Sequence, residues 1–139
     1  MLLGPELIKD SCFDDAGYWT VDDGWSVSAG KAIWQPPSYT GEIYPAEEIA
    51  ISPARIYRVA FDIVAAEDPS KAGLQIILGG TEDPAGYPDD AYTDVGSYSL
   101  DITAGTTDKL VKIHAESAGQ YYIHIDNFSV KEIIQGFLG

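Results

Sequence analysis

Apolar and polar residues alternate with a period of two along most of this chain, and this pattern constrains the fold more than any other feature. In the segment 56–65, IYRVAFDIVA, every second side chain is large and apolar, namely Tyr57, Val59, Phe61 and Ile63. The segments 73–80, 96–105 and 108–117 repeat the pattern. Because successive side chains of a β-strand point to opposite faces, each segment predicts a strand with one buried face.

The number of such segments predicts the architecture. About eight to ten short antiparallel strands, joined by turns and without a helical period, predict an all-β sandwich. The 14 glycines, 8 prolines and 12% aromatic residues agree with that class. The segment 24–34, GWSVSAGKAIW, is expected to form two strands with a turn at Ala29 and Gly30. Long loops are expected at 35–48 and 79–96, and residues 1–139 are treated as a single domain.

The alternation breaks once, inside the segment 121–132, YYIHIDNFSVKE. Ile125 and Phe128 are three positions apart, so both cannot face the core in an unbroken strand. Asp126 and Asn127 lie at the break. A β-bulge, a turn and a metal site are the three interpretations that the residues leave open.

The charge and the few cysteines and histidines exclude several classes of function. A formal net charge of −14 repels nucleic acid and anionic membranes, so neither is expected as a partner. Cys12 is the only cysteine, which excludes an internal disulfide and a cysteine-based zinc site. The start MLLGPELIKD lacks the pattern of a signal peptide, and no apolar run is long enough to span a membrane. We therefore expect a protein made in the cytoplasm without signal-dependent export.

Acidic residues often occur in adjacent pairs, such as Asp14–Asp15 and Asp89–Asp90. Glycoside hydrolysis needs two carboxyl groups that face each other across a cleft. Adjacent residues of a strand point apart, so such doublets predict a solvated acidic surface rather than a catalytic pair. The sequence has no nucleophile elbow, phosphate loop or triad pattern, and we expect no enzymatic activity.

Five motifs carry a resemblance to a known family, and they follow the family's order. They are the opening block 6–34, the strand 51–65, the segment 74–81 (LQIILGGT), the segment 96–117 and the closing segment 123–133 (IHIDNFSVKEI). On these motifs the chain resembles the carbohydrate-binding-module-like, or galactose-binding-like, jelly-roll domains, most closely those of bacteriophage tail and virion proteins. The resemblance implies a jelly-roll sandwich, and one departure is KDSCFDD, where the family usually has Asn-Gly before its acid-Phe pair.

The resemblance also implies a candidate calcium site. In many related jelly rolls a structural Ca²⁺ bridges the N-terminal acidic turn and the closing Asp, which places the ligands here at Asp10, Asp14 and Asp126. The alternative, which we favour because the opening turn departs from the family pattern, is that Asp126 and Asn127 cap backbone groups at a bulge without a metal. Apart from this calcium, no cofactor is expected.

Aromatic residues outside the main strands are candidates for a sugar-stacking platform, because aromatic rings stack on the apolar faces of pyranoses. The candidates are Trp34, Tyr39, Tyr44, Tyr87 and Tyr92. Trp19 and Trp25 match family positions that usually pack inside the sandwich. For each candidate the alternative is packing or a protein interface.

Apolar residues extend beyond the matched region at both ends, in the segments 1–5 and 134–139. Chain ends are normally polar, so Ile134, Phe137 and Leu138 are expected to dock onto a neighbouring subunit or a larger shell. The alternative is that the ends pack against their own sandwich.

Together, these features predict a non-enzymatic structural protein of a bacteriophage virion, either a capsid decoration or a tail or fibre component. It would dock onto capsid or tail proteins, as a homo-oligomer such as a trimer. The alternative is a carbohydrate-binding module that attaches a virion or an enzyme to glycan.

Overall fold

The regular secondary structure of the described residues is almost entirely β-strand. The computed structural model describes residues 2–134, except 23, 36–39, 48, 50 and 85–90. A single short 3-10 turn, η1 (Ala16–Tyr18), is described beside the strands. The described strands are β1 (Leu2–Leu3), β2 (Trp19–Val21), β3 (Trp25–Ser28), β4 (Lys31–Trp34), β5 (Thr40–Pro45), β6 (Ile56–Ala66), β7 (Ala72–Leu78), β8 (Thr81–Asp83), β9 (Gly96–Thr103), β10 (Val111–Ser117) and β11 (Ile123–Ile134).

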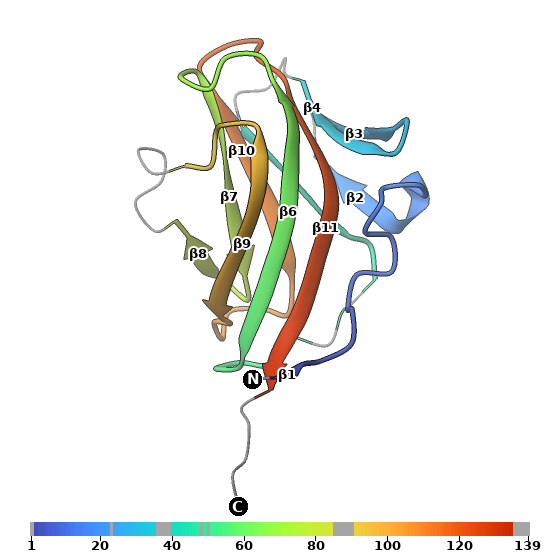
Figure 1. Cartoon of the computed structure of the whole chain (residues 1–139), viewed down its shortest axis with the longest axis vertical. Coiled ribbons are helices and arrows are strands. Elements are labelled where there is room, and N and C mark those ends of the chain that lie inside the picture. The colour runs from blue at the N-terminus through green and yellow to red at the C-terminus, as the bar shows by residue number, and fades with distance from the viewer. Residues whose placement is uncertain are drawn as a thin grey trace, which may run out of the picture.

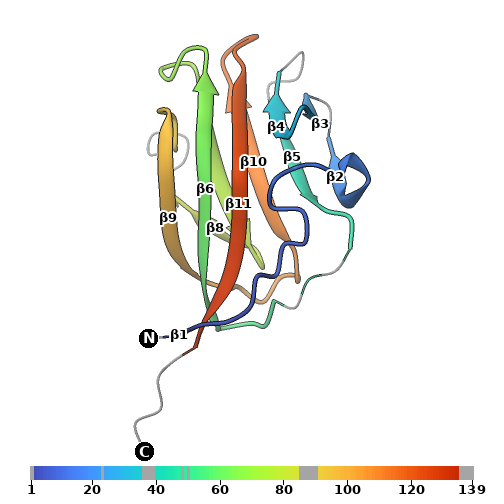
Figure 2. The same cartoon turned by 45° about the vertical axis from the view of Figure 1, so that its right-hand side comes forward.

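The strands form two antiparallel sheets that face each other as a sandwich (Figure 1). One sheet has the order β3-β4-β11-β6-β9, with β1 added beside β11, and the other has the order β2-β5-β10-β7-β8. Figure 2 shows the first sheet from its outer side, with the long strands β6 and β11 at its centre. The predicted all-β jelly-roll sandwich is confirmed, with slightly more strands than expected.

The predicted alternation fills the space between the sheets. Four apolar residues of β6 were predicted to share a face, and all are at most 1% exposed: Tyr57, Val59, Phe61 and Ile63. Ile113 of β10 and Leu74 of β7 meet them from the opposite sheet, and both are also buried. Each apolar side chain removed from water in this way contributes about 1.5–3 kcal/mol, so the core is the main source of stability.

Two segments predicted as loops contain strands, and here the prediction was wrong. The segment 35–48 includes β5, which lies between β2 and β10. The segment 79–96 includes β8, which pairs with the end of β7. Gly41 and Pro45 made β5 resemble a loop, yet Gly41 is buried and Pro45 ends the strand opposite Trp19. Tertiary pairing on both sides of β5 outweighs its weak local propensity.

The break at Asp126 and Asn127 is a β-bulge. The pairing of β11 with β6 shifts between Asp126 and Ser129, so β11 carries one extra residue at this point. Asn127 has a positive φ of 54°, and its side-chain amide donates to Asp62 Oδ2 at 2.7 Å. The extra residue returns Phe128 to the core, where it is 1% exposed. The bulge is confirmed, whereas the absence of a metal, which belonged to the same interpretation, stays a prediction.

The N-terminal segment runs along β11 and closes this side of the sheet. The backbone N–H of Phe128 donates to Ser11 O at 3.0 Å, and the N–H of Leu7 donates to Val130 O at 2.9 Å. The carboxylate of Glu6 accepts the N–H groups of Val130 and Ile8 at 2.8 and 3.2 Å. The two ends of the described chain are therefore held together mainly by main-chain hydrogen bonds.

The apolar ends are only partly in agreement with the predicted docking. Leu2 pairs with Ile134, so the segment 2–3 adds a short strand to its own sheet through main-chain pairing. The side chains of Leu2 and Ile134 are nevertheless 64% and 42% exposed. Phe137 and Leu138 lie outside the described residues, and docking of the C-terminal segment stays a prediction.

The bulge gives a test of the backbone conformation at Asn127. In an ordinary strand, alanine is better tolerated than glycine by about 0.5–1 kcal/mol. At a positive φ the order reverses, because a Cβ costs about 1–2 kcal/mol there. We expect Asn127→Ala to lower the free energy of unfolding more than Asn127→Gly does, measured by urea denaturation. Equal losses, or a less stable glycine variant, would contradict the bulge geometry.

Candidate functional site

The outer face of the five-stranded sheet carries a strip of half-buried polar and aromatic side chains. The period of two places Glu42 and Tyr44 of β5 on this face, beside Lys112 and His114 of β10. Gln75 of β7 continues the strip, because it pairs with His114 in register. Residues from three neighbouring strands therefore lie side by side on one face, with those of β5 and β10 half-buried and Gln75 almost fully buried.

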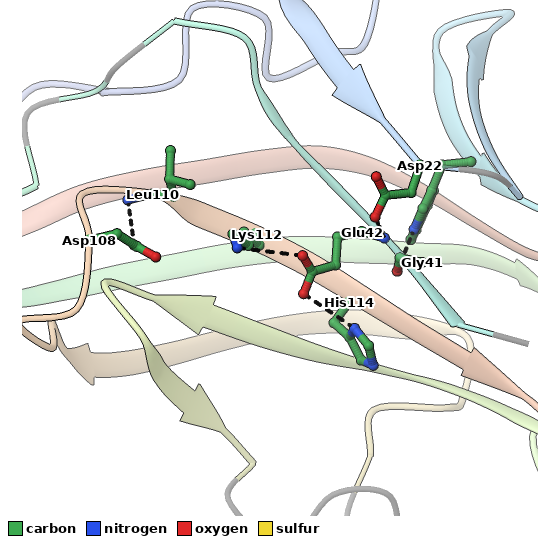
Figure 3. A network of polar contacts seen from close by, with 8 residues as sticks. Asp22, Gly41, Glu42, Asp108, Leu110, Lys112 and His114 are labelled. Atoms are coloured by element: carbon green, nitrogen blue, oxygen red, sulfur yellow. Dashed lines mark hydrogen bonds and ion pairs between the residues drawn. The ribbon is translucent and has the colours of Figure 1, made fainter.

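Glu42 of β5 contacts the two basic side chains of β10, Lys112 and His114. Its Oε1 lies 3.5 Å from Lys112 Nζ, and its Oε2 lies 3.5 Å from His114 Nδ1 (Figure 3). The side chains of Glu42, Lys112 and His114 are 26%, 23% and 21% exposed. Partial burial limits their freedom, so they offer polar atoms at defined positions and not as mobile surface charges.

Tyr44 and Gln75 add an aromatic ring and a buried amide to the strip. The Lys112 ammonium lies 5.8 Å from the centre of the Tyr44 ring. Gln75 is only 3% exposed, and its amide nitrogen donates to Pro84 O at 3.0 Å. A carboxamide that is buried and held in this way has a fixed orientation, and it supports the strip from within the protein and is not itself open to a ligand.

The backbone of β5 forms hydrogen bonds with two side chains, one just after β2 and one in β3. The N–H of Glu42 donates to Asp22 Oδ2 at 3.1 Å, and the indole N–H of Trp25 donates to Gly41 O at 3.0 Å (Figure 3). These contacts come from residues about twenty positions earlier in the chain. They position Glu42 independently of any ligand.

A pocket lies at each end of the strip. Tyr44, Glu47 and Lys109 contribute to one, of ≈ 430 Å³. Lys71, Thr93 and Glu116 contribute to the other, of ≈ 250 Å³. The open face thus continues into a hollow at either end of β10, and an elongated ligand could lie along that strand.

The arrangement suits binding. The strip offers an aromatic ring for stacking and several donors and acceptors for hydroxyl groups, the combination that sugar recognition requires. Its acidic side chain, Glu42, is shared by Lys112 and His114. Among the described residues, we find no nucleophile and base arranged as a catalytic pair on this face.

The aromatic residues predicted as a sugar platform do not form one common site among the described residues. Trp34 is fully buried and packs beside Trp25 with ring centres 5.6 Å apart, so its prediction as a sugar platform was wrong. Tyr44 lies on the open strip, although Lys112 stands over its ring. Tyr39 and Tyr87 lie outside the described residues. Trp19 and Trp25 are buried, as the resemblance implied.

Tyr92 belongs to an aromatic cluster at the edge of the sandwich, where its main chain pairs with Leu74 of β7. Its ring packs edge-on against Phe61 and Tyr98 at 5.8 and 5.3 Å. Its hydroxyl donates to Asp83 Oδ1 at 2.6 Å. Burial, followed by this hydrogen bond, raises the pKa of the Tyr92 hydroxyl well above its usual value. These contacts indicate a packing role for Tyr92.

Two of the three predicted calcium ligands, Asp10 and Asp126, accept hydrogen bonds from nearby N–H groups. The Asp10 carboxylate accepts the backbone N–H groups of Asp14 and Asp15 at 2.9 and 3.0 Å, and the indole N–H of Trp19 at 2.9 Å. Asp126 Oδ1 accepts the N–H of Asn127 at 2.7 Å. Within the described part of the chain, no three His, Cys, Asp or Glu side chains lie together as a metal ion would require. Asp10, Asp14 and Asp126 form no such group, and calcium binding stays a prediction for experiment.

Sequence reasoning missed Glu42 and Gln75 as site residues. The alternation predicted for 108–117 leaves Lys112, His114 and Glu116 on the face opposite the apolar residues, and their intermediate burial agrees with this. Sequence reasoning could not connect them to Glu42, because the segment around Glu42 was interpreted as a loop. The alternation in TGEIYP, with Ile43 between two polar residues, was the signal that could have found β5.

Comparisons with known proteins support the fold. No protein-family model matches the chain, and no curated protein matches it. A solved structure described as CBM4, a carbohydrate-binding module, is 13% identical, with 91% of this chain and 99% of that chain covered and a TM-score of 0.54. A CBM61 in complex with β-1,4-galactotriose is 16% identical, with 94% and 100% covered and a TM-score of 0.51.

A third similar structure is the enzymatically active domain of the bacteriophage CBA120 tailspike protein 4. It is 16% identical, with 92% of this chain but only 21% of that chain covered, and the TM-score is 0.58. At these identities the similarity shows the fold alone. The chain has the jelly-roll fold of carbohydrate-binding modules, as the resemblance implied. Separately, none of the described segments forms a helix long and apolar enough to cross a membrane.

The Asp10 turn gives a test that separates backbone capping from calcium binding. We expect Asp10→Ala to lower the free energy of unfolding by about 1–3 kcal/mol, because three N–H groups lose their charged acceptor. The matched change Asp14→Ala should cost less than about 0.5 kcal/mol. Both losses should be the same in calcium and in chelator. A melting temperature that rises with calcium, and does so no longer in Asp126→Ala, would instead establish the calcium site.

Proposed function

We propose that this protein is a non-catalytic carbohydrate-binding module and that it binds glycan along the outer face of its five-stranded sheet. The observation that carries the proposal is the strip of half-buried side chains formed by Tyr44, Glu42, Lys112 and His114, with a pocket at each end. Sugar rings would stack on Tyr44, and their hydroxyl groups would exchange hydrogen bonds with the polar side chains.

The fold supports this proposal, because two of the solved structures with the same fold are described as carbohydrate-binding modules. Their similarity covers nearly all of this chain and nearly all of each module. Fold similarity alone does not assign a ligand, since one fold hosts many functions. The strip adds what fold similarity cannot give, namely an aromatic ring and polar side chains placed to contact a ligand.

The ligand that fits best is an uncharged glycan. Glu42 neutralises Lys112 within the strip, and Glu116 adds a negative charge at one end. The formal net charge of −14 adds a long-range field that repels polyanions. We therefore propose neutral polysaccharide, and not sulfated or uronic-acid chains, as the ligand class.

A second candidate function is the one that the sequence favoured, a component of a bacteriophage virion. The observation in its favour is the tailspike domain of similar fold, which covers 92% of this chain. The two functions are compatible, because a glycan-binding module within a virion would attach the particle to a polysaccharide. Docking onto capsid or tail proteins, and a place in the virion, remain part of this second proposal.

The binding proposal is tested by screening glycans and measuring affinity by calorimetry. We expect Tyr44→Ala to weaken the binding of a neutral linear glycan by about tenfold or more, because the stacking surface is lost. The matched control is Tyr122→Ala, which removes a half-buried tyrosine whose ring packs at a tilt beside His124 of the other sheet. Its affinity should be unchanged.

Two outcomes would contradict the proposal. One is the absence of binding to any neutral glycan by the wild-type protein. The other is binding that Tyr44→Ala leaves intact while Tyr122→Ala removes it, which would place the ligand on the other sheet. Preferential binding of sulfated or uronic-acid glycans would overturn the proposed ligand class.

A further inference from the structure

The four outermost strands of the sandwich differ greatly in length and charge. The edge strands β2, β3 and β8 have three, four and three residues, and β8 carries two acidic residues. The edge strand β9 has eight residues, GSYSLDIT, with Asp101 as its single charge. Proteins usually shorten or charge their free edges, because an open strand pairs readily with another chain. Among the described edges, β9 alone is both long and nearly uncharged.

The side chains behind this edge are incompletely covered. Tyr98 and Leu100 of β9 point toward the core, yet both are only partly buried. By contrast, the inward side chains Val59 and Phe61 of the neighbouring strand are at most 1% exposed. Figure 2 shows β9 as the outermost strand of its sheet. An additional strand beside β9 would cover Tyr98 and Leu100.

We propose that a second copy of this chain supplies that strand, so that two β9 strands pair antiparallel across a twofold axis. In antiparallel pairing, directly opposed residues lie on the same face. With the axis at Ser99, Tyr98 lies opposite Leu100 of the second copy, which is a favourable aromatic–aliphatic pair. The two six-stranded sheets then form one continuous sheet, and the dimer is closed by its symmetry.

The charges of β9 fit a second copy. In this register Asp101 lies opposite Ser97 of the second copy, so no two like charges face each other. Asp101 is already paired within its own chain, because the Arg58 guanidinium donates to both of its carboxylate oxygens at 2.9 and 3.1 Å. The edge therefore avoids local repulsion in a protein whose formal net charge is −14.

The twofold axis has a consequence for the candidate binding face. Because the axis is perpendicular to the joined sheet, both five-stranded sheets lie on the same side of it. Their outer faces then point in the same general direction, and a polysaccharide surface would be bound at two points at once. This consequence rests on the proposed function, whereas the dimer itself does not.

The dimer is tested first by measuring the mass of the full chain by sedimentation over about a hundredfold range of concentration. We expect a monomer–dimer equilibrium that salt strengthens, because salt screens the repulsion between two acidic chains. Ser99→Lys places two ammonium groups opposite each other at the axis and should weaken the dimer by about tenfold or more. The matched control Ser26→Lys, on the opposite edge strand β3, should leave it unchanged.

The second test uses a cysteine at the axis in a Cys12→Ser background, which removes the single native thiol. Opposed residues of an antiparallel pair lie within the Cα separation that a disulfide spans. Ser99→Cys should therefore yield a disulfide-linked dimer on mild oxidation, and Ser26→Cys should not. This variant keeps the test decisive if Ser99→Lys fails to fold, which thermal melting would reveal.

The proposal is overturned by a wild-type protein that stays monomeric at every concentration and salt, or that forms a trimer, since edge pairing across a twofold axis closes at two chains. A dimer that Ser99→Lys leaves intact, with no cross-link through Ser99→Cys, also overturns it. A cross-link to a different protein, with none between copies, would show that β9 receives another partner. None of these results depends on whether the protein binds glycan.

Discussion

The structure depends on the closing strand β11, because the beginning of the chain must pair with its end. β11 pairs with β6 along most of its length, with β4 on its other side, and with β1 at its C-terminal end. The Glu6 carboxylate accepts the N–H of Val130, 124 residues away, and Ser11 accepts the N–H of Phe128. These contacts join residues far apart in the sequence, so they form only when the strands between them have also folded.

The candidate binding face lies on the other sheet, and it also depends on strands that are distant in the sequence. β10 lies between β5 and β7, and each strand contributes outward polar residues to a common strip. The inward residues of the same strands form the core, so the site cannot move without disturbing the packing. A rigid sheet with a polar outer face is well suited to binding an extended ligand. Its side chains are already held in place, so the protein loses little conformational entropy when the ligand binds.

Much of the fold followed from local patterns, and the misses have physical causes. The alternation in 56–65 and 108–117 correctly assigned inner and outer residues, and the turn lies at Ala29 and Gly30 as expected, with a positive φ at both positions. β5 was missed because its glycine and proline are poor strand formers, and only its two neighbours make it a strand. Trp34 was misassigned because a large aromatic beside a loop gives no local sign of its burial.

The sequence by itself determined that the chain forms a two-layer β-sandwich, which residues face its core and where the closing strand bulges. These properties depend on the two-residue period and on residues adjacent in the chain. The tertiary structure alone decided that Glu42 meets Lys112 and His114. Contacts between residues some seventy positions apart depend on strand order and register, which no local pattern encodes.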